Sequence, residues 1–254
     1  VLSMRYGVCP QSIVALRSAP QDGSEMISQL LYGEHFKILE ARKKWSRVRM
    51  AFDTCEGWVS NLQLQEIPEE EYLEREKIAL PCYSNDLISH VYSTDEKMLQ
   101  PIVLGSVLTK TQSFQHIFEG DFTQGSHEKS SLVKTALLYL KAPYLGGGKT
   151  PFGIDSPGFS QMVYRINGYT LSREIEAQSK QGEALSFIEE SEAGDLAFFD
   201  NEEGIINHVG IILQDNFIIH VYGEVRIDRL DHTGIFNAER RLYTHKLRVI
   251  KKVI

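Results

Sequence analysis

Residues 208–230, HVGIILQDNFIIHVYGEVRIDRL, decide the fold of the C-terminal half of this 254-residue chain. Three runs rich in β-branched residues follow one another, separated by the polar pair at 214–215 and by Gly223. Such runs between turn residues predict antiparallel β-hairpins. His208 opens the first strand and His220 lies at the end of the second, so the hairpin can bring the two imidazoles side by side.

Amphipathic helices precede these strands. Apolar residues recur at helical spacing over residues 130–140, which predicts a helix there. We expect further helices near residues 159–166 and 173–181, and a last strand at 247–254. Helices followed by a run of antiparallel strands indicate an α+β domain.

The N-terminal part is typical of small β-barrels. Short strands alternate with turns containing glycine and proline, and residues 45–50 alternate strictly between polar and apolar side chains. The acidic stretch 68–77 is interpreted as a linker or a short helix. We therefore expect a barrel at 1–67, a second β unit at 78–125 and the α+β domain at 126–254.

Composition narrows the class of protein. The chain has 27 basic and 34 acidic residues, a net charge of −7, which argues against nucleic-acid binding. No apolar run approaches the roughly 18 residues of a membrane helix. The three scattered cysteines are expected to be free thiols in a reducing compartment, and no secretory signal is visible, so we expect a cytoplasmic protein.

No metal or organic cofactor is expected. Neither the cysteines nor the histidines show the spacing of a metal-ligand cluster. His232 and His245 are expected to be surface residues. The glycine-rich run 146–150 lacks the spacing of a phosphate-binding loop.

A candidate catalytic arrangement joins the two histidines to the segment Asp155–Phe159, which stands at the start of a helix. A nucleophile at a helix N-terminus is favoured in its anionic form. One imidazole can take the proton of Ser156 while the other orients the first. The alternative is that Ser156 only caps the helix and that His208 and His220 are ordinary strand residues.

Four segments resemble, in order and separation, motifs of the NlpC/p60 family of papain-like cysteine peptidases, which cut bacterial cell-wall peptides. They are PYLGGGKT (143–150), GIDSPGF (153–159), GDLAFF (194–199) and HVGI (208–211). LRSAP (16–20) and EGWV (56–59) resemble bacterial Src-homology-3-like domains. The whole arrangement is similar to the γ-D-glutamyl-L-diamino-acid endopeptidases of murein recycling, which implies a murein-derived peptide with a free N-terminus as ligand.

The resemblance implies roles for particular residues. Ser156 stands at the place of the nucleophilic cysteine, His208 at that of the general base and His220 at that of the orienting third residue. Tyr144 matches a tyrosine that stabilises the oxyanion, and Asp155 matches the acid that receives the substrate's amine. The substrate site is predicted to consist of Asp155, Arg173, Gly146 and Tyr222.

The chain departs from the family at positions that line the cleft. The family has Asp-Cys-Ser-Gly where this chain has Asp155 to Gly158, and tryptophan where Gly146 stands. It has small residues at the positions of Val221 and Tyr222, and a small polar residue near Ile175. These departures predict a degenerate site.

The alcohol of Ser156 is far less acidic than a thiol, whose pKa is about 8.5, so the thiolate–imidazolium route is closed. Ser156 followed by Pro157 also predicts an N-cap, which would commit the hydroxyl to the helix amides. We therefore expect a weakly active or inactive protein that binds murein peptide or a partner. An endopeptidase using Ser156, His208 and His220 is the alternative, and a structural protein that interacts through its barrels is a third hypothesis.

Overall fold

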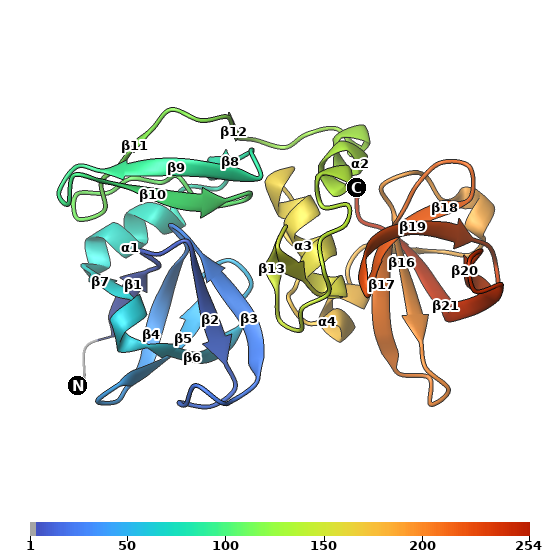
Figure 1. Ribbon diagram of the computed structural model, residues 1–254, viewed down its shortest axis with the longest axis horizontal. Coiled ribbons are helices and arrows are strands. Elements are labelled where there is room, and N and C mark those ends of the chain that lie inside the picture. The colour runs from blue at the N-terminus through green and yellow to red at the C-terminus, as the bar shows by residue number, and fades with distance from the viewer. Residues whose placement is uncertain (1–3) are drawn as a thin grey trace. The chain divides into compact units, whose positions relative to one another are not determined.

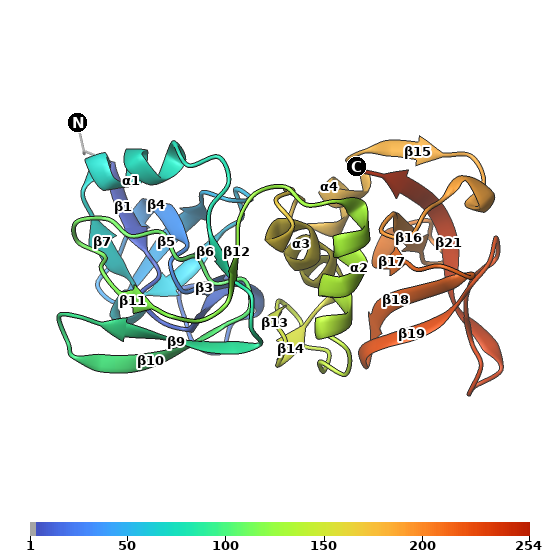
Figure 2. The same cartoon turned by 90° about the horizontal axis from the view of Figure 1, so that it is seen from above.

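The computed structural model describes residues 4–254, which form two compact units. The first unit contains the residues up to Ser126 together with Gly146–Thr150. The second unit contains His127–Leu145 and Pro151–Ile254. Figures 1 and 2 show the first unit from blue to green and the second from green to red.

A seven-stranded antiparallel sheet, in the order β3-β2-β6-β5-β4-β1-β7, forms the SH3-like part of the first unit. Its elements are β1 (Arg5–Val8), β2 (Ile13–Arg17), β3 (Met26–Leu31), β4 (His35–Ala41), β5 (Trp45–Met50), β6 (Glu56–Ser60), η1 (Asn61–Gln63) and β7 (Gln65–Ile67). Alternate side chains of β4 and β5 point inward, so Phe36 and Val48 are fully buried beside Leu16 and Leu30. The alternation read from residues 45–50 is confirmed.

The acidic stretch forms helix α1 (Glu69–Glu76), which joins the barrel to the remaining strands of the first unit. These are β8 (Tyr83–Ser84), β9 (Ile88–Ser93), β10 (Met98–Val103), β11 (Ile117–Phe118), β12 (Phe122–Thr123) and β13 (Lys149–Thr150). Helix α1 and strands β9 and β10 share one core with the barrel, because Tyr72, Val91 and Ile102 lie in one buried cluster with Tyr6 of β1. The ring centroids of Tyr72 and Tyr6 are 4.4 Å apart, and those of Phe114 and Tyr32 are 5.0 Å apart.

The second unit packs helices against an antiparallel sheet in the order β15-β21-β16-β17-β18-β19-β20. Because β20 also pairs with β21, the sheet closes on itself around a core that includes Phe199, Ile218 and Ile250. Its elements are α2 (Lys129–Leu138), β14 (Gly153–Ile154), α3 (Ser156–Ile166), α4 (Ile175–Ser179), β15 (Glu183–Leu185), η2 (Ile188–Glu190), β16 (Leu196–Asp200), β17 (Ile206–Ile212), β18 (Phe217–Tyr222), β19 (Glu224–Leu230), β20 (Gly234–Asn237) and β21 (Leu242–Lys252). The predicted α+β class is confirmed, with a papain-like second unit.

The last strand differs from its prediction. β21 begins at Leu242, five residues before the expected start, because its polar first half pairs with β20, a strand the sequence did not predict. Gly234 opens β20 at a φ of 151°, and a Cβ there would lie 1.8 Å from His245 O. A glycine at this position therefore allows the close approach of β20 and β21.

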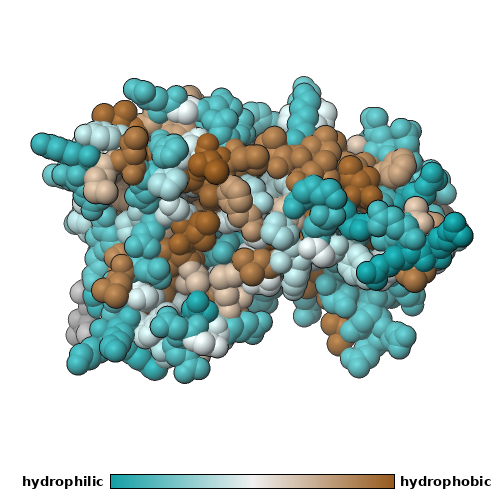
Figure 3. Space-filling view, in the orientation of Figure 1, coloured by the Kyte–Doolittle hydropathy of each residue, from teal (hydrophilic) through white to brown (hydrophobic). Residues whose placement is uncertain are grey.

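Helix α2 contributes one face to the core of its unit. Leu132 and Ala136 are fully buried, whereas Leu137 and Leu138 are exposed. Figure 3 shows apolar side chains gathered over α2 and the neighbouring part of β19. None of the helices within residues 4–254 is long and apolar enough to span a bilayer.

Candidate active site

The N-terminus of α3 carries the serine predicted at the nucleophile's position. Asp155 is the N-cap residue: its backbone is extended, and its side chain accepts a hydrogen bond from Gly158 N at 2.8 Å. Ser156 is the first helical residue and Pro157 the second. The prediction that Ser156 caps the helix is therefore wrong, because the carboxylate one position earlier satisfies the free amide.

Ser156 is free of the capping role. The residue is 7% exposed, and its backbone N–H is among the first amides of α3, which have no carbonyl partner within the helix. Such an amide, supported by the helix dipole, stabilises negative charge that develops beside it. The first turn of α3 therefore offers a donor for an oxyanion.

The Asp155 carboxylate also forms an ion pair. Its Oδ2 lies 2.8 Å from Arg173 Nη2, and Arg173 is buried. Gln178, also buried, holds the same turn: its Nε2 donates to Pro157 O at 3.2 Å and its Oε1 accepts from Ser160 Oγ at 2.6 Å. Two predicted substrate-binding residues, Asp155 and Arg173, thus contact each other, and their role toward a substrate stays a prediction.

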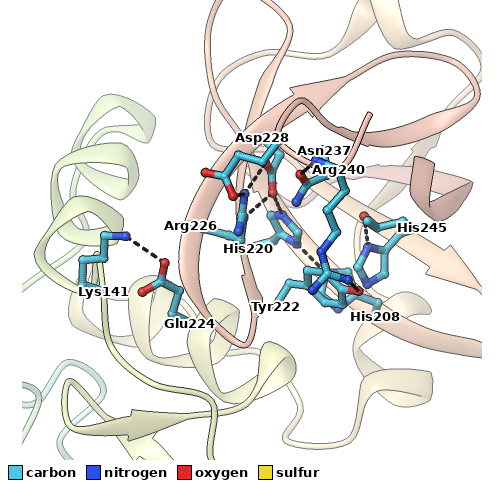
Figure 4. Close-up of polar contacts among 12 residues, drawn as sticks. Lys141, His208, His220, Tyr222, Glu224, Arg226, Asp228, Asn237, Arg240 and His245 are labelled. Atoms are coloured by element: carbon cyan, nitrogen blue, oxygen red, sulfur yellow. Dashed lines mark hydrogen bonds and ion pairs between the residues drawn. The ribbon is translucent and has the colours of Figure 1, made fainter. Parts of the chain in front are cut away.

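The two histidines meet across the β17–β18 hairpin. The register pairs His220 with Gly210, so His208 lies two residues before the partner of His220 and meets His220 diagonally. His208 Nε2 and His220 Nδ1 are 2.9 Å apart, and His220 Nε2 lies 2.8 Å from Asp228 Oδ2 of β19 (Figure 4). The three side chains form one buried chain of polar contacts.

Gly210 leaves space for the side chain of His220. Because a methyl group would fill that space, we expect Gly210→Ala to lower the free energy of unfolding by about 1–3 kcal/mol. A Cβ at Gly210 would lie 2.9 Å from His220 Cβ and 2.7 Å from Ile218 Cδ1, so the histidine has to move. Urea denaturation measures the loss. Gly23→Ala is the control, since nothing lies within 4 Å of its Cβ position; equal stability of the two variants would contradict the prediction.

Asp228 fixes which nitrogens are protonated in the contacts that run from His208 through His220 to Asp228. Burial opposes its ionisation, but hydrogen bonds from His220 and Arg226 outweigh burial and lower the pKa of Asp228 to about 2. Arg226 Nε and Nη2 lie 2.7 and 3.0 Å from the two carboxylate oxygens. An ionised Asp228 accepts from His220 Nε2–H, so His220 Nδ1 accepts from His208 Nε2–H. We infer that His208 Nδ1 then carries the lone pair of a base.

His245 of β21 is a third member of the histidine cluster. The prediction that it is a surface residue is wrong, because its ring stacks on His208 with centroids 3.9 Å apart and planes 24° apart. Burial, and then the neighbouring His220, lower the pKa of His245 to about 4. Burial also lowers the pKa of His208, well below its ordinary value, and that of His220. All three imidazoles are therefore neutral at pH 7.

His208, His220 and His245 are also the one histidine cluster among residues 4–254 that could hold a metal ion, with ligand atoms within 4.8 Å of one another. A metal lies in the plane of each imidazole that binds it. The rings of His208 and His245 are nearly parallel and 3.9 Å apart, so no metal position near their nitrogens lies in both ring planes. His245 would have to turn before both residues could bind one ion. The observed arrangement suits a stack of neutral rings better than a metal centre.

The two predicted tyrosines lie on neighbouring segments of backbone, and of the two it is Tyr222 whose ring contacts the cluster. Tyr144 N donates to Gly223 O at 2.9 Å, and Tyr144 bridges to Ile154, two residues before Ser156. The Tyr144 side chain is 58% exposed, and its role at an oxyanion stays a prediction. Tyr222 stacks parallel to His220 at 6.4 Å and meets the edge of His245 at 5.1 Å.

Gly146 belongs to a segment that folds with the first unit. Within that unit Lys149 is buried, its backbone N donates to Gln29 Oε1 at 2.7 Å, and its Nζ lies 3.5 Å from Glu34 Oε1. The lysine of this glycine-rich run is therefore engaged in a buried ion pair, unlike a phosphate-binding lysine. The substrate-binding role of Gly146 stays a prediction.

Sequence reasoning missed Asp228, Arg226 and His245. The available signal was the pair of opposite charges two residues apart in the strand that follows His220, since residues i and i+2 share one face of a strand. No such signal marked His245, which lies in a polar stretch.

Comparison with known proteins now defines the class. Residues 141–241 match the NlpC/P60 family, and residues 16–64 match the bacterial dipeptidyl-peptidase Sh3 domain. The chain thus contains an NlpC/P60 domain, with a bacterial SH3 domain ahead of it. More particularly, it is homologous to gamma-D-glutamyl-L-lysine dipeptidyl-peptidases.

The relatives extend over most of the chain. Gamma-D-glutamyl-L-lysine dipeptidyl-peptidase of Bacillus subtilis is 24% identical over 234 residues, 85% of this chain and 75% of that protein. Dipeptidyl-peptidase 6 of Lysinibacillus sphaericus is 24% identical over 249 residues, 85% of this chain and 88% of that protein. The crystal structure of an NlpC/P60 family protein from Bacillus cereus, 18% identical, superimposes with a TM-score of 0.80 and covers 98% of this chain and 99% of its own. That likeness confirms the predicted fold.

Proposed function

We propose that the chain binds murein peptides that contain a γ-D-glutamyl–diamino-acid bond and has lost rapid hydrolysis of that bond. The observation that carries the proposal is that Ser156, an alcohol, stands where the resemblance places the nucleophile, while His208, the expected base, is buried with its pKa well below the ordinary value. A thiol gives up its proton to such an imidazole far more readily than an alcohol does. Homology to gamma-D-glutamyl-L-lysine dipeptidyl-peptidases supports the choice of ligand.

Hydrolysis through Ser156 is the second candidate, and two observations favour it. Asp155 takes over the cap, which leaves the Ser156 hydroxyl available, and the contacts from His208 through His220 to Asp228 are complete. Serine hydrolases use the same types of group. The two candidates differ in turnover and share the ligand.

The test uses L-Ala-γ-D-Glu-L-Lys with the full chain. Calorimetry is expected to show saturable binding, while chromatography shows no release of lysine above that of Ser156→Ala. Ser156→Cys is the matched variant that restores a thiol at the same place. Release of lysine by the unmodified chain that His208→Ala abolishes would establish the second candidate instead, and absence of binding would overturn both.

A further inference from the structure

An unpaired guanidinium lies beside the histidine cluster. Arg240 follows β20, and its backbone N donates to the buried Asn237 Oδ1 at 2.9 Å, which fixes the start of the side chain. From there the side chain extends toward Tyr222 and the histidines (Figure 4). Within residues 4–254 no carboxylate forms an ion pair with Arg240, although Arg226 nearby is paired with Asp228 and Glu239.

Tyr222 holds this guanidinium at the edge of the site. Arg240 Cζ lies 5.7 Å from the Tyr222 ring centroid, and Nη1 lies 3.5 Å from the Tyr222 hydroxyl. The other side of the contact is fixed too, because the Tyr222 ring runs within 10° of parallel to His220 and meets His245 edge-on. A cation over an aromatic face keeps its outward N–H groups free for a ligand.

These two side chains present the donors that a carboxylate needs. A guanidinium offers paired N–H groups that match two carboxylate oxygens, and a phenol adds an O–H donor. Tyr222 is 36% exposed and Arg240 is exposed, so an anion can reach both. The buried Asp228 does not compete with such an anion for Arg240, because Arg226 already binds both carboxylate oxygens of Asp228.

We propose that Arg240 and Tyr222 form a carboxylate subsite that selects the free α-carboxylate of the γ-linked glutamyl residue. The inference rests on the proposed function for its ligand. A glutamyl residue joined through its side chain keeps its α-carboxylate ionised beside the γ-amide, whereas an ordinary peptide bond at the same place has none. The subsite therefore distinguishes a γ-linked acid from a peptide whose α-carboxylate is amidated.

The experiment uses calorimetry to compare L-Ala-γ-D-Glu-L-Lys with an analogue in which the α-carboxylate of the glutamyl residue is a carboxamide and the lysine carboxylate is unchanged. We expect the unmodified chain to bind the free acid about tenfold more tightly, and Arg240→Gln to remove that preference. Arg241→Gln is the matched control, because it removes the same charge from the next exposed residue and is expected to keep the preference. Equal affinity of the unmodified chain for both peptides, or a preference that survives in Arg240→Gln, would overturn the subsite.

A fragment separates this inference from the proposed function. D-glutamate γ-methylamide carries the same α-carboxylate without the rest of the peptide, and NMR follows the Arg240 Nε–H signal, assigned by its loss in Arg240→Gln. A shift with this fragment and none with its α-carboxamide supports the subsite even if the tripeptide fails to bind, which would defeat only the proposed function. An unmoved Arg240 signal with the fragment refutes the subsite.

Discussion

Replacing Asp228 by asparagine is expected to lower the free energy of unfolding by about 2–4 kcal/mol, since removing one member of a buried ionic chain leaves the others uncompensated. Asp228 is 6% exposed and accepts from both His220 and Arg226. An amide of the same shape has one acceptor oxygen, so one of these donors faces an N–H₂ group. Urea denaturation at pH 7 measures the loss.

The same variant is expected to change the tautomer of the histidines. Where the asparagine turns its N–H₂ group to His220, the proton pattern reverses and His208 loses the lone pair on Nδ1. Nitrogen-15 chemical shifts of the imidazoles report this directly. Asp215→Asn, which removes the same charge from an exposed turn, is expected to stay within about 0.5 kcal/mol of the unmodified chain.

A second variant makes the prediction sharper. Arg226→Gln in the Asp228→Asn background removes the cation left without its carboxylate, so the double variant is expected to lose less stability than the sum of the two single losses. Additive losses would show that the effects of Arg226 and Asp228 on stability are independent, and would contradict the inferred coupling between this guanidinium and this carboxylate.

Asp228 illustrates what the sequence could not provide. Alternation within residues 224–230 favours Val225 and Ile227 as the buried face, yet Ile227 is exposed and Asp228 is buried. The register decides this, because Arg226 pairs with His220 and Asp228 pairs with Ile218, which places both charges on the face that carries the histidine. The alternation of apolar residues within one strand does not decide which of its faces is buried when the neighbouring strand offers a polar partner.

The parts that were predictable rest on local chemistry. Turn residues between apolar runs predicted the β17–β18 hairpin, and helical spacing predicted α2. The helix start at α3 was predicted one residue too late, since aspartate and serine are both good caps and proline fits either of the first two positions. His245 was unpredictable because its place follows from the closure of β21 on β20, a long-range pairing without an apolar pattern.

The histidine cluster is also expected to make the protein sensitive to acid. The pKa of His245 is lowered to about 4 and those of His208 and His220 are lowered too, so the unfolded chain binds protons that the folded chain excludes. Stability is therefore full above pH 6.5 and falls as the pH drops from 6.5 toward 4. His245 alone accounts for about 3 kcal/mol over that interval.

Asp228 adds to this loss at lower pH only. Its pKa of about 2 lies below the ordinary value of 3.8, so the stability it contributes is present above pH 4 and is lost between pH 4 and 2. Loss of stability between pH 6.5 and 4.5 thus reports histidines with lowered pKa values, which include His116 of the first unit as well as the cluster, and not Asp228. Urea denaturation at pH 7.5 and pH 5 separates the two groups.

His245→Phe is the decisive variant, because it keeps an aromatic ring against His208 and removes one titrating group. We expect it to lose less free energy of unfolding between pH 7.5 and pH 5 than the unmodified chain does, by about 1–2 kcal/mol. His232→Gln is the control, since this exposed histidine lies on the turn before β20 and should leave the pH dependence unchanged. If His245→Phe and the unmodified chain lose the same stability, the stacked ring does not exclude protons and the cluster is more open to water than its burial indicates.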